Sequence, residues 1–127
     1  MIQIGLLGCG TVGSGVVKLL EKNAATIAQR SGDEVVIHRV MEKDKDKCLA
    51  VGIAPERITT NIEDIVNDPE IDIVVELIGG IEPASSYILQ AMHQGKHVVT
   101  ANKDLIAVSG KELFETAEEN QVDFYFE

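Results

Sequence analysis

The sequence predicts a doubly wound α/β fold, a mainly parallel six-stranded sheet with helices on both faces. Three observations predict it. An apolar segment, Ile2 to Leu7, runs directly into a glycine-rich turn that opens a helical pattern. A second segment, residues 71–78, is almost continuously β-branched, which is typical of a strand buried on both faces of a parallel sheet. Predicted strands and helices alternate along the rest of the chain.

Length and composition indicate one globular domain over residues 1–127. The chain has 45% hydrophobic residues, enough to bury a core that needs no disulfide bond or metal ion to stabilise it. Its formal net charge of -10 argues against nucleic acid as a partner, because such binding requires Lys and Arg to neutralise phosphates. Apolar runs are too short to span a membrane, and the amino terminus does not resemble a signal peptide. We therefore expect a cytoplasmic location and no membrane partner.

The two cysteines do not indicate a metal site. Cys9 lies in the glycine turn and Cys48 in a charged stretch, and neither has the spacing of a metal ligand. We expect two free thiols and assign no metal ligand.

Periodicity and turn residues give the order of the elements. Apolar residues at helical spacing predict the first helix from the glycine turn to about Arg30. Asn61 with Asp64 predicts the cap of a short helix, and Pro83 the first turn of the next, with Gly95 in a left-handed position after it. Ser109 and Glu112 predict a capping box that starts the last helix, and Asn120 closes it. The remaining strands are predicted at residues 34–41, 57–60, 97–100 and 122–126.

The predicted strand order is 3-2-1-4-5-6, which follows from right-handed crossovers and a reversal after the third strand. In such a sheet, ligands bind beyond the carboxyl ends of the strands, near the reversal. The residues that follow these strand ends are therefore the candidate site.

The first candidate is the turn Gly8-Cys9-Gly10-Thr11-Val12-Gly13. A GxGxxG between a strand and a helix is the fingerprint of a Rossmann-type dinucleotide site. Gly8 permits the tight turn, Gly10 lets the backbone approach a pyrophosphate, and Gly13 permits close packing of helix on strand. The helix N-terminus, with Thr11 and Val12, supplies N–H groups and a positive dipole end for the phosphates.

The second candidate is Glu42, the acidic residue after the second strand. Such a carboxylate accepts hydrogen bonds from the adenosine ribose and repels a 2′-phosphate, so we favour NAD over NADP. Its distance from Gly13 is longer than the usual interval of about 20 residues. Lys43, Lys45 and Lys47 are the opposing evidence, since any of them could turn toward a phosphate. A merely solvated charge at the strand end is the alternative for Glu42.

The third candidate follows the fourth strand. Ile78 and the pair Gly79-Gly80 would let the nicotinamide half of the cofactor lie against the backbone. A simple turn before Pro83 explains the glycine pair equally well, and only its position at the strand end favours function.

Three motifs make the sequence specific: residues 8–17, residues 75–84 and residues 95–103, which end in Thr100-Ala101-Asn102-Lys103. Together they closely resemble the amino-terminal domain of homoserine dehydrogenase, over essentially the whole chain. The resemblance implies hydride transfer between a nicotinamide cofactor and homoserine or aspartate 4-semialdehyde. It also implies that Lys103 is catalytic and contacts cofactor and substrate, and that Thr100 and Asn102 belong to the cofactor site.

The resemblance has two departures. Many relatives carry an arginine, suited to NADP, where this chain has Glu42. The family's substrate-binding and dimerisation domain is absent from this sequence, so we expect the isolated domain to bind cofactor without turning over homoserine. The full-length protein is expected to be a homo-oligomer.

Two other functions stay open at this point. One is a non-catalytic module that senses NAD or NADH. The other is the cofactor domain of a related amino-acid oxidoreductase such as aspartate dehydrogenase.

Overall fold

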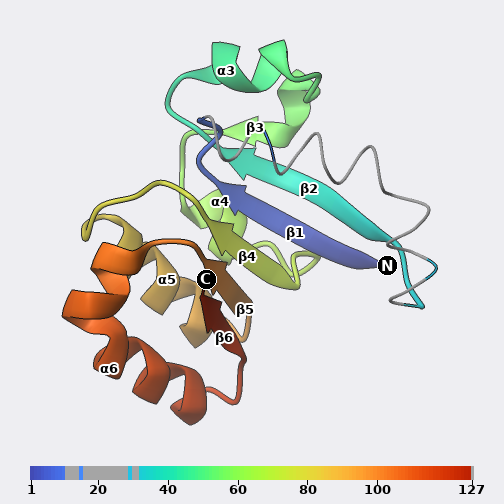
Figure 1. The fold of residues 1–127 in the computed structure, drawn as a ribbon. Helices are drawn as coiled ribbons and strands as arrows, with labels where there is room; N and C mark the ends of the chain where they lie inside the picture. Colours follow the sequence, from blue (N-terminus) through green and yellow to red (C-terminus); the bar gives the residue numbers. More distant parts are fainter. Residues whose placement is uncertain (11–14, 16–28, 30–31, 127) are drawn as a thin grey trace.

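A computed structural model describes residues 1–10, 15, 29 and 32–126 of the chain (Figure 1). It contains a six-stranded sheet in the order β3-β2-β1-β4-β5-β6, in which all neighbouring strands are parallel. The predicted order is therefore confirmed. The strands are β1 (Ile2–Leu7), β2 (Val35–Met41), β3 (Ile58–Thr59), β4 (Ile73–Glu76), β5 (His97–Thr100) and β6 (Phe124–Phe126).

The order reverses at β1, which pairs with β2 on one side and with β4 on the other. Leu7 is opposite Met41 in β2 and Glu76 in β4, so these three strands end at the same level. Thr100 of β5 is opposite Glu76 in turn. The residues that follow β1, β2, β4 and β5 therefore meet along one edge of the sheet, as the fold class predicts.

Helices cover both faces of the sheet. Neighbouring residues of β1 face opposite sides, because successive side chains of a strand alternate. Leu7 packs in a core with side chains of α4 (Glu63–Val66), α5 (Ala84–His93) and α6 (Lys103–Glu119). Leu6 packs on the opposite face with Cys48 of α3 (Lys45–Ala50). Figure 1 shows α5 and α6 side by side against β4–β6, and α3 beyond β3.

Strand β2 has one extra residue in its pairing with β1. Ile4 pairs with Ile37, but the next residue, Gly5, pairs with Arg39, so His38 falls outside the regular register. A bulge of this kind changes which face the following side chains take. Ile37 and Val40 consequently pack in the same core cluster although they are three positions apart.

Two predicted helix starts are wrong, and one short helix was not predicted. The last helix begins at Lys103, because the side chain of Asn102 caps it by accepting a hydrogen bond from the N–H of Leu105 at 3.1 Å. Ser109 therefore lies inside the helix and forms no capping box. Asn61 provides no side-chain cap for α4, and α3, which follows the N-cap Asp44, was not predicted.

Other boundaries are confirmed. Strand β5 has the predicted bounds, Gly95 has a φ of 77°, and Asn120 is the C-cap of α6. A short 3-10 helix, η1 (Pro55–Arg57), precedes β3. Apart from residues 15 and 29, which are helical, the predicted first helix lies outside the described residues. In the described part of the chain, no helix is long and apolar enough to cross a membrane.

Candidate functional site

The turn after β1 is held between the ends of β2 and β4. The N–H of Gly8 donates to the carbonyl of Met41 at 2.9 Å. Gly8 has a φ of 95°, and a Cβ on it would lie 3.2 Å from the carbonyl carbon and oxygen of Leu77. Both the conformation and the close backbone contact require glycine at this position. A Cβ added to Gly10 would meet no described atom within 4 Å, so its backbone is open to a ligand.

Glu42 is attached to this turn. Its Oε1 accepts a hydrogen bond from the N–H of Cys9 at 2.9 Å, and its Oε2 accepts one from the N–H of Asp44 at 3.1 Å. Burial acts to raise the pKa of Glu42, but the hydrogen bonds from Asp44 and Cys9, together with the charge of Lys47, outweigh it and lower the pKa. The carboxylate is therefore ionised and held beside the glycine turn.

A pocket of about 280 Å³ lies over the ends of β1 and β2. Four of the predicted cofactor residues, Gly8, Gly10, Glu42 and Lys43, line it, and Ile78 joins them from the segment after β4. The described residues around it also include Met41, Lys47, Leu77, Pro83 and Tyr87.

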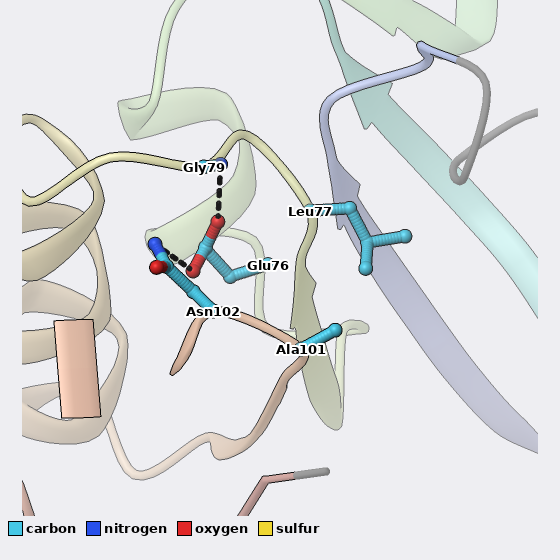
Figure 2. Close-up of a pocket in the computed structure, with 5 residues that line it drawn as sticks. All are labelled: Glu76, Leu77, Gly79, Ala101 and Asn102. Carbon is cyan, nitrogen blue, oxygen red and sulfur yellow. Dashed lines mark hydrogen bonds between the residues drawn. The ribbon is translucent and has the colours of Figure 1, made fainter. Parts of the chain in front are cut away.

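Glu76 ends β4 and is fully buried. Its Oε2 accepts hydrogen bonds from the N–H groups of Ile78 at 2.7 Å and Gly79 at 3.1 Å. Its Oε1 accepts from the Thr100 hydroxyl at 2.7 Å and, more weakly, from the Asn102 amide at 3.4 Å. Figure 2 shows the carboxylate between Gly79 and Asn102. One side chain thus ties together the segments that follow β4 and β5.

Thr100 and Asn102 complete this arrangement. The Thr100 hydroxyl accepts the N–H of Asn102 at 3.0 Å while it donates to Glu76. The Asn102 side chain caps α6 with its oxygen and donates its amide to the carbonyl of Gly80 at 2.5 Å. Thr100 and Asn102 therefore position the two segments, in addition to any contact they make with a ligand.

A second, smaller pocket of about 190 Å³ lies over the ends of β4 and β5 (Figure 2). It is lined by Glu76, Leu77, Gly79, Ala101 and Asn102. Leu77 also lines the larger pocket, so the two pockets adjoin across the segment after β4. Together they form a two-part site that crosses the point where the strand order reverses.

Lys103 is exposed at the first position of α6, directly after Asn102. Gly80 contributes its carbonyl to Asn102. Neither residue is among those that line the two pockets. The predicted positions Thr11, Val12 and Gly13 lie outside the described residues.

Glu76, Leu77 and Tyr87 are site residues that the sequence motifs did not predict. Glu76 could have been predicted from the sequence, since it is an acidic residue at the carboxyl end of an otherwise apolar strand. Leu77 and Tyr87 could not, because apolar and aromatic residues at these spacings are typical of a core.

One group of potential metal ligands occurs in the described part of the chain, near the amino end of β4. His38 Nε2 lies 3.0 Å from Asp68 Oδ2 and 3.4 Å from Glu70 Oε2. These contacts are ion-pairing distances, and the group is separate from both pockets. We assign it no ligand.

Comparison with known proteins decides the family. The family model of the NAD-binding domain of homoserine dehydrogenase matches residues 8–127. The chain belongs to the homoserine dehydrogenase family. A homoserine dehydrogenase of Bacillus subtilis (strain 168) is 47% identical over 99% of this chain, and that of Pseudomonas aeruginosa is 44% identical over 99%. These matches favour the homoserine dehydrogenase interpretation over a sensing module or another oxidoreductase.

Solved structures of homoserine dehydrogenases have the same fold. A homoserine dehydrogenase from Thiobacillus denitrificans superposes with a TM-score of 0.93 at 49% identity and covers 99% of this chain. The S. aureus enzyme at pH 6.5 superposes with a TM-score of 0.89 at 44% identity, again over 99% of this chain. The chain spans 29% of the first structure, 32% of the second, and 29% of each of the two curated relatives named above.

Proposed function

We propose that this chain is the dinucleotide-binding domain of an enzyme that interconverts homoserine and aspartate 4-semialdehyde. A bound nicotinamide cofactor supplies the hydride acceptor or donor. The single observation that carries the proposal is the two-part pocket at the reversal of the sheet, in a chain that matches the NAD-binding domain of the family. Substrate-binding and dimerisation residues would belong to the remainder of the enzyme.

The residues of the two pockets fit the two halves of a dinucleotide. Gly8 and Gly10 line the larger pocket, and the backbone of Gly10 is not covered by any described atom, so a pyrophosphate would be bound there by peptide N–H groups. Glu42 in the same pocket would accept hydrogen bonds from the adenosine ribose. The smaller pocket, lined by Leu77, Gly79 and Ala101, would take the nicotinamide. This assignment uses the predicted site residues Ile78, Thr100 and Asn102 as lining or positioning groups.

We propose NAD as the preferred cofactor, because the ionised carboxylate of Glu42 lines the larger pocket and would repel a 2′-phosphate. Lys43 and Lys47 line the same pocket, and their positive charges would attract the 2′-phosphate of NADP. Glu42 is fixed by two backbone hydrogen bonds, whereas Lys43 and Lys47 are exposed. The fixed charge is therefore the better discriminator.

Lys103 is proposed as the catalytic residue that handles the proton of the substrate hydroxyl. A lysine with an ordinary pKa near 10.4 is a weak base at neutral pH, so this role requires that the remainder of the enzyme desolvate it or place a cation beside it. Lys103 follows Asn102, which lines the smaller pocket, so it lies near the nicotinamide end of the proposed site. A cytoplasmic location and a homo-oligomeric full-length enzyme stay predictions from the sequence.

Calorimetry of this chain with NAD and with NADP tests both the function and the cofactor preference. We expect NAD to bind more tightly than NADP, and Glu42→Ala to reduce the difference by about tenfold or more, since a hydrogen bond to a charged group contributes about 1.5–3 kcal/mol. Glu56→Ala is the matched control, because Glu56 is an exposed glutamate on η1. Tighter binding of NADP by the unchanged chain would refute the role of Glu42, and failure to bind either dinucleotide would refute the proposed function.

A further inference from the structure

Glu76 is a buried carboxylate whose neighbours are all donors. The N–H groups of Ile78 and Gly79 point at one oxygen. The Thr100 hydroxyl donates to the other oxygen, and its own oxygen accepts the N–H of Asn102. The Asn102 amide adds a fourth, longer contact. Every described hydrogen bond of the Glu76 side chain is therefore one that the carboxylate oxygens accept, and such bonds favour the charged form of a carboxyl group.

Glu76 has no cationic partner among the residues that the structure describes. No salt bridge in the described part of the chain includes Glu76, and its contacts are with backbone, hydroxyl and amide groups only. Burying a charge costs free energy unless it is paired. Hydrogen bonds offset part of that cost but leave a net negative charge beneath the smaller pocket.

We propose that Glu76 selects the redox state of the bound dinucleotide and favours the oxidised form. The inference rests on the proposed function, in which the smaller pocket takes the nicotinamide. An oxidised nicotinamide ring carries a positive charge, whereas the reduced ring is neutral. Glu76 lines this pocket and is fully buried, so its charge is weakly screened by water. The oxidised ring therefore supplies the missing counter-charge, and the reduced ring does not.

A purely structural role for Glu76 makes a different prediction. If the carboxylate only holds the segments after β4 and β5 together, its loss would weaken the binding of oxidised and reduced cofactor by the same factor. A charge effect weakens the binding of the oxidised form alone. The ratio of the two dissociation constants separates these roles.

The test measures the binding of the oxidised and reduced dinucleotide by calorimetry, with NAD or NADP according to which the unchanged chain binds more tightly. In Glu76→Gln we expect the oxidised form to bind about three- to tenfold more weakly and the reduced form to change less than twofold. Thr100→Val is the matched control, because it removes the two hydrogen bonds of the Thr100 hydroxyl, with Glu76 and with Asn102, and keeps the charge. It should leave the ratio unchanged. An unchanged ratio in Glu76→Gln would overturn the inference.

A second measurement needs no variant and decides the case if Glu76→Gln does not fold. ADP-ribose lacks the nicotinamide, so it reports the affinity of the larger pocket alone. The unchanged chain should bind the oxidised dinucleotide more tightly than ADP-ribose and at least about threefold more tightly than the reduced one. Equal or tighter binding of the reduced form would overturn the inference while the proposed function stands. Failure to bind any of the three would overturn both.

Discussion

Glu42 and Glu76 lie at the carboxyl ends of the two strands that flank β1, and they differ in almost everything else. Glu42 is partly exposed and accepts two backbone hydrogen bonds, and two lysines line its pocket. Glu76 is fully buried, accepts four hydrogen bonds, and lines a pocket without a basic residue among its described lining. The same residue type at equivalent places thus produces two different electrostatic environments.

The difference suits two halves of one ligand. The larger pocket can bind sugar hydroxyls and phosphates through backbone groups and charges that water still reaches. The smaller pocket has a mainly apolar surface and one fixed charge, that of Glu76, which suits a ring whose charge changes in the reaction. The following predictions test this division, starting with the largest expected effect.

Lys103→Ala in a full-length homoserine dehydrogenase that contains this domain should lower turnover by about 10²–10⁴-fold, the usual contribution of a general acid or base. Cofactor affinity should change little, because Lys103 does not line either pocket. Steady-state kinetics with homoserine and direct cofactor binding measure the two effects. Lys111→Ala, an exposed lysine further along α6, is the control. Full activity of Lys103→Ala would remove this residue from the mechanism.

Gly8→Ala should destabilise the chain by roughly 2–4 kcal/mol, because it combines a left-handed backbone with a Cβ 3.2 Å from the Leu77 carbonyl. Gly10→Ala is the matched comparison. It should change stability by less than about 0.5 kcal/mol and weaken dinucleotide binding, since its backbone is open in the described structure. Urea unfolding and calorimetry check both. Equal stability of the two variants would contradict the assigned contact between β1 and the segment after β4.

Asn102→Ala should cost about 1–2 kcal/mol of stability, because it removes the cap of α6 and the hydrogen bond to Gly80. Asn61→Ala should cost less than about 0.5 kcal/mol, since the side chain of Asn61 does not cap α4. Thermal unfolding of the two variants in parallel measures the difference. A larger loss for Asn61→Ala would reverse our assignment of the two caps.

Glu42→Gln should give the smallest effect, a loss of stability that depends on pH. The folded-state pKa of Glu42 is lowered, although burial opposes this, because Asp44 and Cys9 donate hydrogen bonds to the carboxylate. A lowered pKa stabilises the fold at pH values above 4.5, the ordinary pKa of a glutamate. This contribution is lost as the pH falls through the pKa that Glu42 has in the folded state. Urea unfolding at neutral pH should therefore give a lower free energy of unfolding for Glu42→Gln than for the unchanged chain. This difference in free energy should shrink as the pH falls below 4.5. A difference in the free energy of unfolding that grows on acidification would contradict the lowered pKa of Glu42.

The strand order and the bounds of β5 could be predicted from sequence because they depend on local signals: β-branched runs, glycine turns and alternation with helices. The start of α6 could not. Ser109-Gly110 looks like a turn, yet Gly110 is buried within the helix, where tertiary packing outweighs the low helix propensity of glycine. The actual cap, Asn102, is fixed by contacts with residues more than 20 positions away.

The site was predictable in part for the same reason. Gly8 and Gly10 belong to a motif with a known spacing, and Glu42 directly follows a predicted strand, so all three could be placed before the structure. Glu76 depends on Thr100 and Asn102, which the fold brings beside it from the next strand. A sequence shows such a residue only as a charge where none is expected.

The extra residue at His38 has a consequence for how β2 can change length. Ile4 and Leu6 of β1 face Ile37 and Val40, and Gly5 faces Arg39, so every partner is accounted for without His38. Removal of this one residue would bring Ile37 and Val40 to the ordinary spacing of two and leave each of them against the same neighbour. The domain can therefore lose a residue there with only the contacts to Asp68 and Glu70 forfeited. Removal of Met41 would instead move Glu42 one place back, opposite Leu7, and turn its carboxylate from the pocket toward the core.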